Sequence, residues 1–150
     1  MKRLRCLKIA RLNCHLQIAS MRLLLDTHIL LWALDTPECL PDSLREQLES
    51  PETEVYFSAA SIWEIAIKSA LGKVSFHYSP DQIAEGARMT GFVEIPIASE
   101  HAAGVARLPL HHADPFDRLL VAQALAMPAR LVTADTALIV YSELIEYVGG

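Results

Sequence analysis

Short apolar runs alternate with segments of helical periodicity along most of the chain. The apolar run at residues 23–25 predicts a buried strand over residues 22–25, and the segment 27–34, apolar on nearly every face, predicts a buried helix. Further strands are predicted at residues 54–58, 92–97, 130–133 and 144–148, and further helices at 43–48, 60–71, 79–91, 99–107 and 116–126, with a short helix or turn at 134–140. Because strands alternate with helices, the pattern predicts a three-layer α/β/α domain with a mostly parallel sheet of four or five strands.

Local sequence signals mark where several of these helices begin. Ser43 with Glu46, and Ser79 with Gln82, have the spacing of a capping box, in which the first side chain and the fourth satisfy each other's backbone amides. Ser99 is expected to cap the helix that follows it. These signals are local, so they predict helix ends and leave the packing of the helices open.

The composition favours one globular domain and divides the chain into a basic start and an acidic remainder. Residues 1–20 carry five of the 13 Lys and Arg residues and none of the 18 acids, so residues 21–150 have a formal charge of -10. Such a domain is a poor general binder of nucleic acid, because phosphate affinity comes from Lys and Arg. We expect residues 1–20 to be a weakly ordered extension, or an upstream read-through with translation starting at Met21, and residues 21–150 to form the domain.

The cysteines and the hydropathy pattern predict where the protein works. Cys6, Cys14 and Cys39 form no CxxC pair and are odd in number, so the sequence indicates neither a zinc site nor a disulfide framework and fits a reducing cytoplasm. Apolar runs stay shorter than the roughly 18 residues that a membrane helix needs. We therefore expect a cytoplasmic protein that makes no membrane contact.

Acidic residues recur just past the predicted strands. Asp26 directly follows the apolar run Leu23–Leu25, and the same pattern places Glu64, Asp114 with Asp117, and Asp135. If the strands are parallel, these carboxylates meet at the carboxyl edge of the sheet, where open α/β folds place their ligands. Clustered carboxylates need cations, and hard divalent ions prefer oxygen ligands. The pattern therefore predicts a metal site that supports phosphoryl chemistry.

Each acid also has an ordinary structural interpretation. Asp26, Asp114 and Asp135 are suited to helix capping, and Asp117 is a favourable acid in a first helical turn. Four acids at equivalent positions of the fold are harder to assign to capping alone. Asp117 ranks above Asp114 as a metal ligand, because its position in the helix is one from which side chains project toward the edge of the sheet.

Glu64 has two such interpretations. It could bond back to the amide of Ser61 in a capping box, or form an ion pair with Lys68 four residues later. In the functional interpretation Lys68 offsets charge or meets a phosphate, and Arg118 pairs with a neighbouring acid or contacts a substrate phosphate.

Four segments of the sequence resemble the PIN domain, the nuclease fold of VapC-type toxins in bacterial toxin–antitoxin pairs. The matching segments are LLLDTH at residues 23–28, SIWEIAIK at 61–68, DPFDRLLVAQA at 114–124 and LVTAD at 131–135. One such motif would be weak evidence, whereas four in order with suitable gaps across residues 21–148 are specific. The basic extension before Met21 departs from the family pattern, in which the first strand begins within a few residues of the start.

The resemblance implies a metal-dependent endoribonuclease that uses Mg²⁺ or Mn²⁺. Asp26, Glu64, Asp117 and Asp135 would form the acidic quartet that holds the metal, with Asp114 as an auxiliary residue. Direct ligation is expected of Asp26 and Asp117, while Glu64 and Asp135 would hold water or a second ion. Substrate or water contacts are expected of further residues, Thr27, Ser61, Lys68, Arg118 and Thr133, and the hydroxyls of Ser61 and Thr133 could orient water or a carboxylate.

The same resemblance implies an RNA substrate, a cognate antitoxin protein that covers the acidic groove, and a homodimer with the apolar first helices as candidate contacts. A catalytically inactive PIN module that binds RNA or protein is the alternative. An Asp-dependent phosphohydrolase fits less well, because His28 stands where a second Asp is expected. The histidines, including the adjacent His111 and His112, are expected in loop or surface roles, and Trp63 in core packing.

Overall fold

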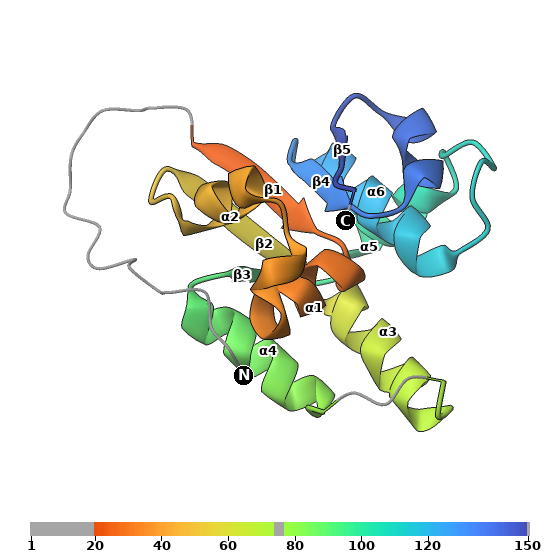
Figure 1. Cartoon of the computed structure of the whole chain (residues 1–150). Helices are drawn as coiled ribbons and strands as arrows, with labels where there is room; N and C mark the ends of the chain where they lie inside the picture. The colour runs from red at the N-terminus through yellow and green to blue at the C-terminus, as the bar shows by residue number, and fades with distance from the viewer. Residues whose placement is uncertain (1–19, 74–76, 150) are drawn as a thin grey trace.

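The computed structural model describes residues 20–73 and 77–149 of the chain (Figure 1). A single five-stranded sheet lies at the centre, and every neighbouring pair of strands is parallel. Its strands are β1 (Met21–Leu25), β2 (Thr53–Ser58), β3 (Val93–Ile95), β4 (Arg130–Thr133) and β5 (Ile145–Tyr147). The predicted parallel sheet is confirmed, and its upper estimate of five strands is correct. The prediction that residues 1–20 are a weakly ordered extension falls almost wholly outside the described residues.

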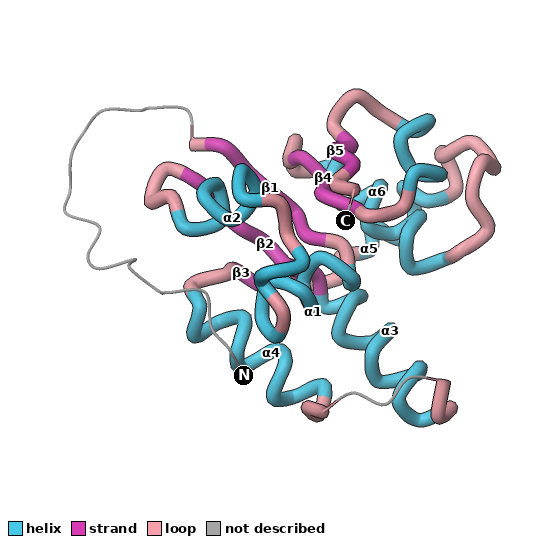
Figure 2. The backbone as a smooth tube through the Cα atoms, viewed as in Figure 1, coloured by secondary structure: helices cyan, strands magenta, loops and turns pink. Residues whose placement is uncertain are grey.

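Helices cover both faces of the sheet (Figure 2). They are α1 (Thr27–Asp35), α2 (Asp42–Glu49), α3 (Ala59–Ala70), α4 (Pro80–Thr90), α5 (Ser99–Val105) and α6 (Pro115–Ala126), with two 3₁₀ segments, η1 (Pro37–Cys39) and η2 (Thr136–Tyr141). Every helix lies within a few residues of its predicted range. In the described part of the chain, no helix is long and apolar enough to cross a bilayer.

Alternation along the central strand explains the three layers. Leu23 and Leu25 of β1 pack into a core with α1, α2 and α4, whereas Leu24 points to the opposite core with α6 and η2. Successive side chains of a strand face opposite sides, so a strand buried on both sides reads as a continuous apolar run. The unbroken run of leucines in the sequence is therefore the signature of a central strand.

The strand order places a ligand crevice beside β1. The order is β3-β2-β1-β4-β5, so the chain builds outward from β1 on one side and then crosses to β4 on the other. At this reversal the connections leave β1 and β4 toward opposite faces, which opens a crevice at their carboxyl ends. The amide of Asp26 donates to the carbonyl of Val132 across this gap at 3.0 Å.

Local helix signals succeed at some ends and fail at others. Ser79 and Gln82 form the predicted capping box, and Gly91 closes α4 with a φ of 94°, which glycine adopts without strain. The capping box predicted for Ser43 and Glu46 is wrong, because α2 begins at Asp42 after Pro41 without a side-chain cap. Ser99 is already the first residue of α5 rather than its cap.

Trp63 is a further correction. Its side chain is 56% exposed and meets the ring of Phe116 edge-on, with 5.1 Å between ring centroids. The buried face of α3 is formed by its neighbours Ala60, Ser61, Glu64 and Ile65. Helix α3 is apolar on most faces, so periodicity alone could not tell which face turns inward.

Candidate functional site

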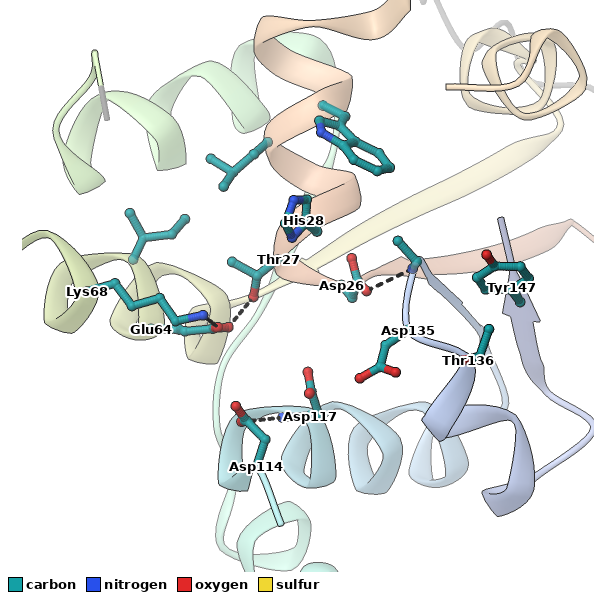
Figure 3. A pocket seen from close by; sticks show the side chains of 14 residues that line it. Asp26, Thr27, His28, Glu64, Lys68, Asp114, Asp117, Asp135, Thr136 and Tyr147 are labelled. Atoms are coloured by element: carbon teal, nitrogen blue, oxygen red, sulfur yellow. Dashed lines mark hydrogen bonds and ion pairs between the residues drawn. The ribbon is translucent and has the colours of Figure 1, made fainter. Parts of the chain in front are cut away.

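All five acids singled out in the sequence line one cleft at the carboxyl end of the sheet. The cleft has a volume of about 610 Å³, and Figure 3 shows the acids around it: Asp26, Glu64, Asp114, Asp117 and Asp135. They come from different elements, since Asp26 follows β1, Glu64 lies on α3, Asp117 on α6 and Asp135 after β4. The parallel sheet and the first turns of two helices thus bring together residues more than 100 positions apart.

Asp26 is the most rigidly held carboxylate of the cleft. Its Oδ1 accepts from the amide of Ile29 at 2.8 Å, which makes it the N-cap of α1, while its Oδ2 accepts from Thr133 Oγ1 at 2.5 Å and from the amide of Ala134 at 3.3 Å. Burial raises the pKa of Asp26, and these hydrogen bonds oppose the rise. Capping and participation in the site are therefore compatible roles for this residue.

Glu64 is buried and held by two neighbours. Thr27 Oγ1 donates to its Oε2 at 2.5 Å, and the Lys68 ammonium pairs with its Oε1. The pairing with Glu64 raises the pKa of Lys68. The alternative in which Glu64 bonds back to Ser61 is wrong, because α3 begins at Ala59 with Ser58 as its cap. Lys68 neutralises the charge of Glu64 inside the cleft.

Asp117 is the least compensated carboxylate. Burial, and next the nearby charge of Asp114, raise the pKa of Asp117 to about 7. Asp114 itself caps α6, because its Oδ1 accepts from the amides of Phe116 and Asp117 at 2.8 and 3.3 Å. A carboxylate in this position is stabilised by binding either a proton or a metal cation.

Asp135 stands opposite Asp117 and is joined to it by a histidine. His112 Nε2 lies 2.9 Å from Asp135 Oδ2 and 3.4 Å from Asp117 Oδ2. The hydrogen bond to His112 lowers the pKa of Asp135 and raises that of His112. One ligand-type atom from each of the three residues lies within 4.8 Å of the other two.

The donor set of the cleft fits a hard divalent cation. Carboxylate oxygens are the ligands that Mg²⁺ and Mn²⁺ prefer, and a bound cation relieves the repulsion between crowded carboxylates. Asp26 and Asp117 offer carboxylates that face the same cleft, and Asp117 has a raised pKa that a cation would reverse.

Comparison with known proteins assigns this architecture to a family. A family model of the PIN domain matches residues 23–144. The chain belongs to the PIN domain family. PIN domains are generally nucleases, and the match spans all five acids of the cleft. A search of curated proteins finds no match.

Solved structures share the PIN fold at low sequence identity. A chain in the crystal structure of VapBC2 from Rickettsia felis, bound to a DNA fragment from its promoter, is 17% identical, with a TM-score of 0.61; 85% of this chain and 99% of that chain are covered. FitAcB from Neisseria gonorrhoeae is 20% identical, with a TM-score of 0.51; 79% of this chain and 91% of that chain are covered. FitAB bound to an IR36 DNA fragment is 18% identical, with a TM-score of 0.54; 83% of this chain and 94% of that chain are covered.

The other residues expected to act in this PIN domain differ in where they lie. Thr27 and Lys68 line the cleft, whereas Thr133 lies beneath it and orients Asp26. Ser61 is buried and outside the cleft lining, and its hydroxyl has no hydrogen-bond partner among residues 20–73 and 77–149. The Ser61 hydroxyl therefore orients no carboxylate in the described part of the chain, and its interaction with water stays a prediction.

Arg118 does not lie where the sequence analysis expected it, beside an acid or at the substrate. Its side chain is buried, and its guanidinium donates to the carbonyls of Pro109 and Val105 at 2.9 and 3.1 Å and to Tyr141 Oη at 3.1 Å. Two longer contacts reach the carbonyls of Leu108 and His112. Arg118 therefore shapes the loop before α6; it contacts no acid within residues 20–73 and 77–149 and does not line the cleft.

We expect Arg118→Met to destabilise the protein by about 3 kcal/mol, because several buried carbonyls would lose a charged donor. Urea unfolding in the presence of a chelator measures this effect, with the exposed Arg88→Met as the matched control. An Arg118→Met protein as stable as the unaltered chain would contradict the structural role.

No sequence pattern singles out His112, because adjacent histidines in a loop have no helical or strand spacing. The loop position is as expected, yet the ring reaches two acids from other elements. The signal that could have selected it is its place two residues before Asp114, at the start of the most distinctive motif of the chain.

Proposed function

We propose that this protein is an Mg²⁺- or Mn²⁺-dependent endoribonuclease that hydrolyses RNA phosphodiester bonds and acts as the toxin of a toxin–antitoxin pair. One observation carries the proposal: a PIN-family cleft gathers five acids, and one of them, Asp117, is so poorly compensated that its pKa rises to about 7. The toxin role is supported by the likeness of the fold to chains of VapBC and FitAB complexes.

The residues of the cleft divide the work of the reaction. Asp26 and Asp117 would hold the metal directly, with Glu64 and Asp135 completing its surroundings or holding a second ion. When bound, a divalent ion neutralises phosphate charge, lowers the pKa of an attacking water and stabilises the leaving oxygen. The two backbone amides and the Thr133 hydroxyl that hold Asp26 fix its carboxylate before any ligand arrives, which avoids reorganisation during the reaction.

Lys68 and Thr27 hold the Glu64 carboxylate in place at the other end of the cleft. Because Lys68 is half exposed and lines the cleft, it is also the residue best placed to meet a substrate phosphate there. RNA affinity would then come mainly from metals and from this one cation, since residues 21–150 are strongly acidic.

The proposed partners follow from charge and from exposed apolar surface. An acidic cleft suits a basic segment of an antitoxin, whose cations would occupy the place of the metal and the substrate. In the proposed homodimer, α1 offers little contact area because Ile29, Leu30 and Ala33 are fully buried. Helix α3 with its C-cap is the better candidate surface, because Trp63 on the helix and Leu71 at the cap are exposed.

The nuclease proposal is tested by incubating the full chain with single-stranded RNA and Mg²⁺ or Mn²⁺. We expect cleavage that a chelator abolishes and that Asp26→Asn reduces at least about a hundredfold, because the carboxamide loses the negative charge but still accepts the helix-capping bond from Ile29. Asp81→Asn, at an exposed position on α4, is the matched control and should cleave normally.

Other results of this experiment would favour one of the alternative functions. RNA binding without cleavage under any divalent ion would favour an inactive PIN module. Hydrolysis of small phosphate esters without RNA cleavage would favour a phosphohydrolase. An Asp26→Asn protein with full metal-dependent activity would contradict the assignment of the acidic quartet.

A further inference from the structure

His112 is held by four different residues. Its backbone amide donates to Tyr141 Oη at 2.8 Å, and its carbonyl accepts from Arg118 at 3.4 Å. On the ring, Nδ1 accepts from the amide of Asp114 at 3.0 Å, and Nε2 lies 2.9 Å from Asp135 Oδ2. The position of the backbone and the orientation of the imidazole are both determined, which is unusual for a side chain in a loop without secondary structure.

These contacts fix which ring nitrogen carries the proton. An amide N–H is always a donor, so Nδ1 must present its lone pair to Asp114. The proton of the neutral ring then lies on Nε2, where it points at the carboxylate of Asp135. The ring therefore offers a hydrogen-bond donor to the acidic cleft.

This tautomer argues against His112 as a metal ligand. A histidine nitrogen binds a metal through its lone pair, and at Nε2 that position is taken by the proton. Oxygen-preferring ions such as Mg²⁺ also have little affinity for imidazole. The proximity of His112 to Asp117 and Asp135 is better explained by a donor that stands between two carboxylates.

Each carboxylate oxygen of Asp135 accepts one hydrogen bond from the protein. Oδ1 accepts from the amide of Ala137 at 2.8 Å, and Oδ2 from His112. Without the imidazole, this carboxylate, which is 42% exposed, would keep only the hydrogen bond from Ala137 and could rotate away from Asp117. The donor also reduces the repulsion between the two acids.

We propose that His112 is a positioning residue whose Nε2–H holds the Asp135 carboxylate toward Asp117, so that the two acids present a preformed site to a divalent cation. The role rests on the proposed metal-dependent function and adds a residue outside the acidic quartet. Arg118 and Tyr141 contribute by fixing the loop that carries the ring.

The first test measures the binding of Mn²⁺ alone to the full chain by calorimetry. His112→Ala should bind at least about tenfold more weakly, because partners that orient ligands typically contribute that much. His112→Gln should regain most of the affinity, since its amide N–H reaches about as far as Nε2–H. His77→Ala, in an exposed loop outside the cleft, should bind normally.

A spectroscopic measurement distinguishes a His112 that positions Asp135 from a His112 that binds the metal directly. Pulsed electron paramagnetic resonance of the Mn²⁺-loaded chain should show no coupling to a directly bound ¹⁴N nucleus. Direct ¹⁴N coordination would overturn the proposal, as would unchanged affinity in His112→Ala or a Gln variant as weak as the Ala variant. If His112→Ala fails to fold, the affinity of the Gln variant and the resonance spectrum still test the positioning role of His112.

A double-mutant cycle on RNA cleavage tests whether His112 acts through Asp135. His112→Ala should lower kcat about tenfold or more in the unaltered chain and have little further effect in Asp135→Asn, whereas additive losses would overturn the proposal. If the unaltered chain binds Mn²⁺ but cleaves no RNA, the nuclease proposal fails and the binding arms still test His112. Absence of Mn²⁺ binding would contradict both.

Discussion

Asp117→Asn is expected to reduce RNA cleavage at least about a thousandfold while making the metal-free protein more stable at pH 8. The cause is the same for both effects. Asp117 lies in the cleft near Asp114, Glu64 and Asp26, and burial together with their charges raises its pKa to about 7. At pH 8 the carboxylate is ionised without a cation, which is unfavourable, and an uncharged amide removes that cost.

The sign and size of the stability effect follow from linkage. A carboxylic acid whose pKa is higher in the folded than in the unfolded state stabilises the fold only while protonated, so stability is lost as pH rises from about 4 to about 7. One pKa unit corresponds to about 1.4 kcal/mol. Allowing for solvent screening, we expect a gain on the order of 2 kcal/mol, more than the roughly 0.5 kcal/mol lost from the interaction of a first-turn acid with the helix dipole.

Urea unfolding at pH 8 with a chelator measures this stability, and the RNA assay with Mn²⁺ measures the activity. Asp135→Asn is the informative control, because the hydrogen bond from His112 lowers the pKa of Asp135 and its ionised form stabilises the fold. That variant should lose activity and also lose stability. An Asp117→Asn protein that is less stable than the unaltered chain, or that cleaves RNA normally, would contradict our account of the site.

The affinity for Mn²⁺ is expected to fall about tenfold per pH unit as pH decreases from 7 to 5, because a proton competes with the metal for Asp117. Above pH 7.5 the affinity should be nearly constant. Asp26, whose pKa is also raised, acts in the same direction at lower pH. Near pH 6 each bound ion should release about one proton, and near pH 8 almost none.

Calorimetry in buffers of different ionisation enthalpy counts these protons directly. The matched variant is Asp117→Asn, whose residual Mn²⁺ binding should lose most of its pH dependence between 6 and 8. An affinity that stays constant in the unaltered chain from pH 5 to pH 8 would show that Asp117 is not the group that exchanges a proton for the metal.

Periodicity along the chain was enough to predict the helices and strands and the edge of the sheet where the acids meet. A continuous leucine run predicted a buried strand, and the alternation of strands with helices predicted a parallel sheet, both of which the structure confirms. Parallel strands end at one edge, so acids that follow strands were expected to meet there, and the structure places them along one cleft. These inferences depend on local periodicity and on general rules of chain connection.

Tertiary contacts, which no local pattern predicts, select the side chains that reach the cleft and those that hold it in place. Arg118 follows Asp117 directly yet is buried beneath a loop, and Trp63 precedes Glu64 yet faces outward. His112, from a loop that has no predictive pattern, reaches acids on α6 and after β4. The reason is physical: spacing along one element determines which of its residues share a face, whereas the contacts of that face depend on elements distant in sequence.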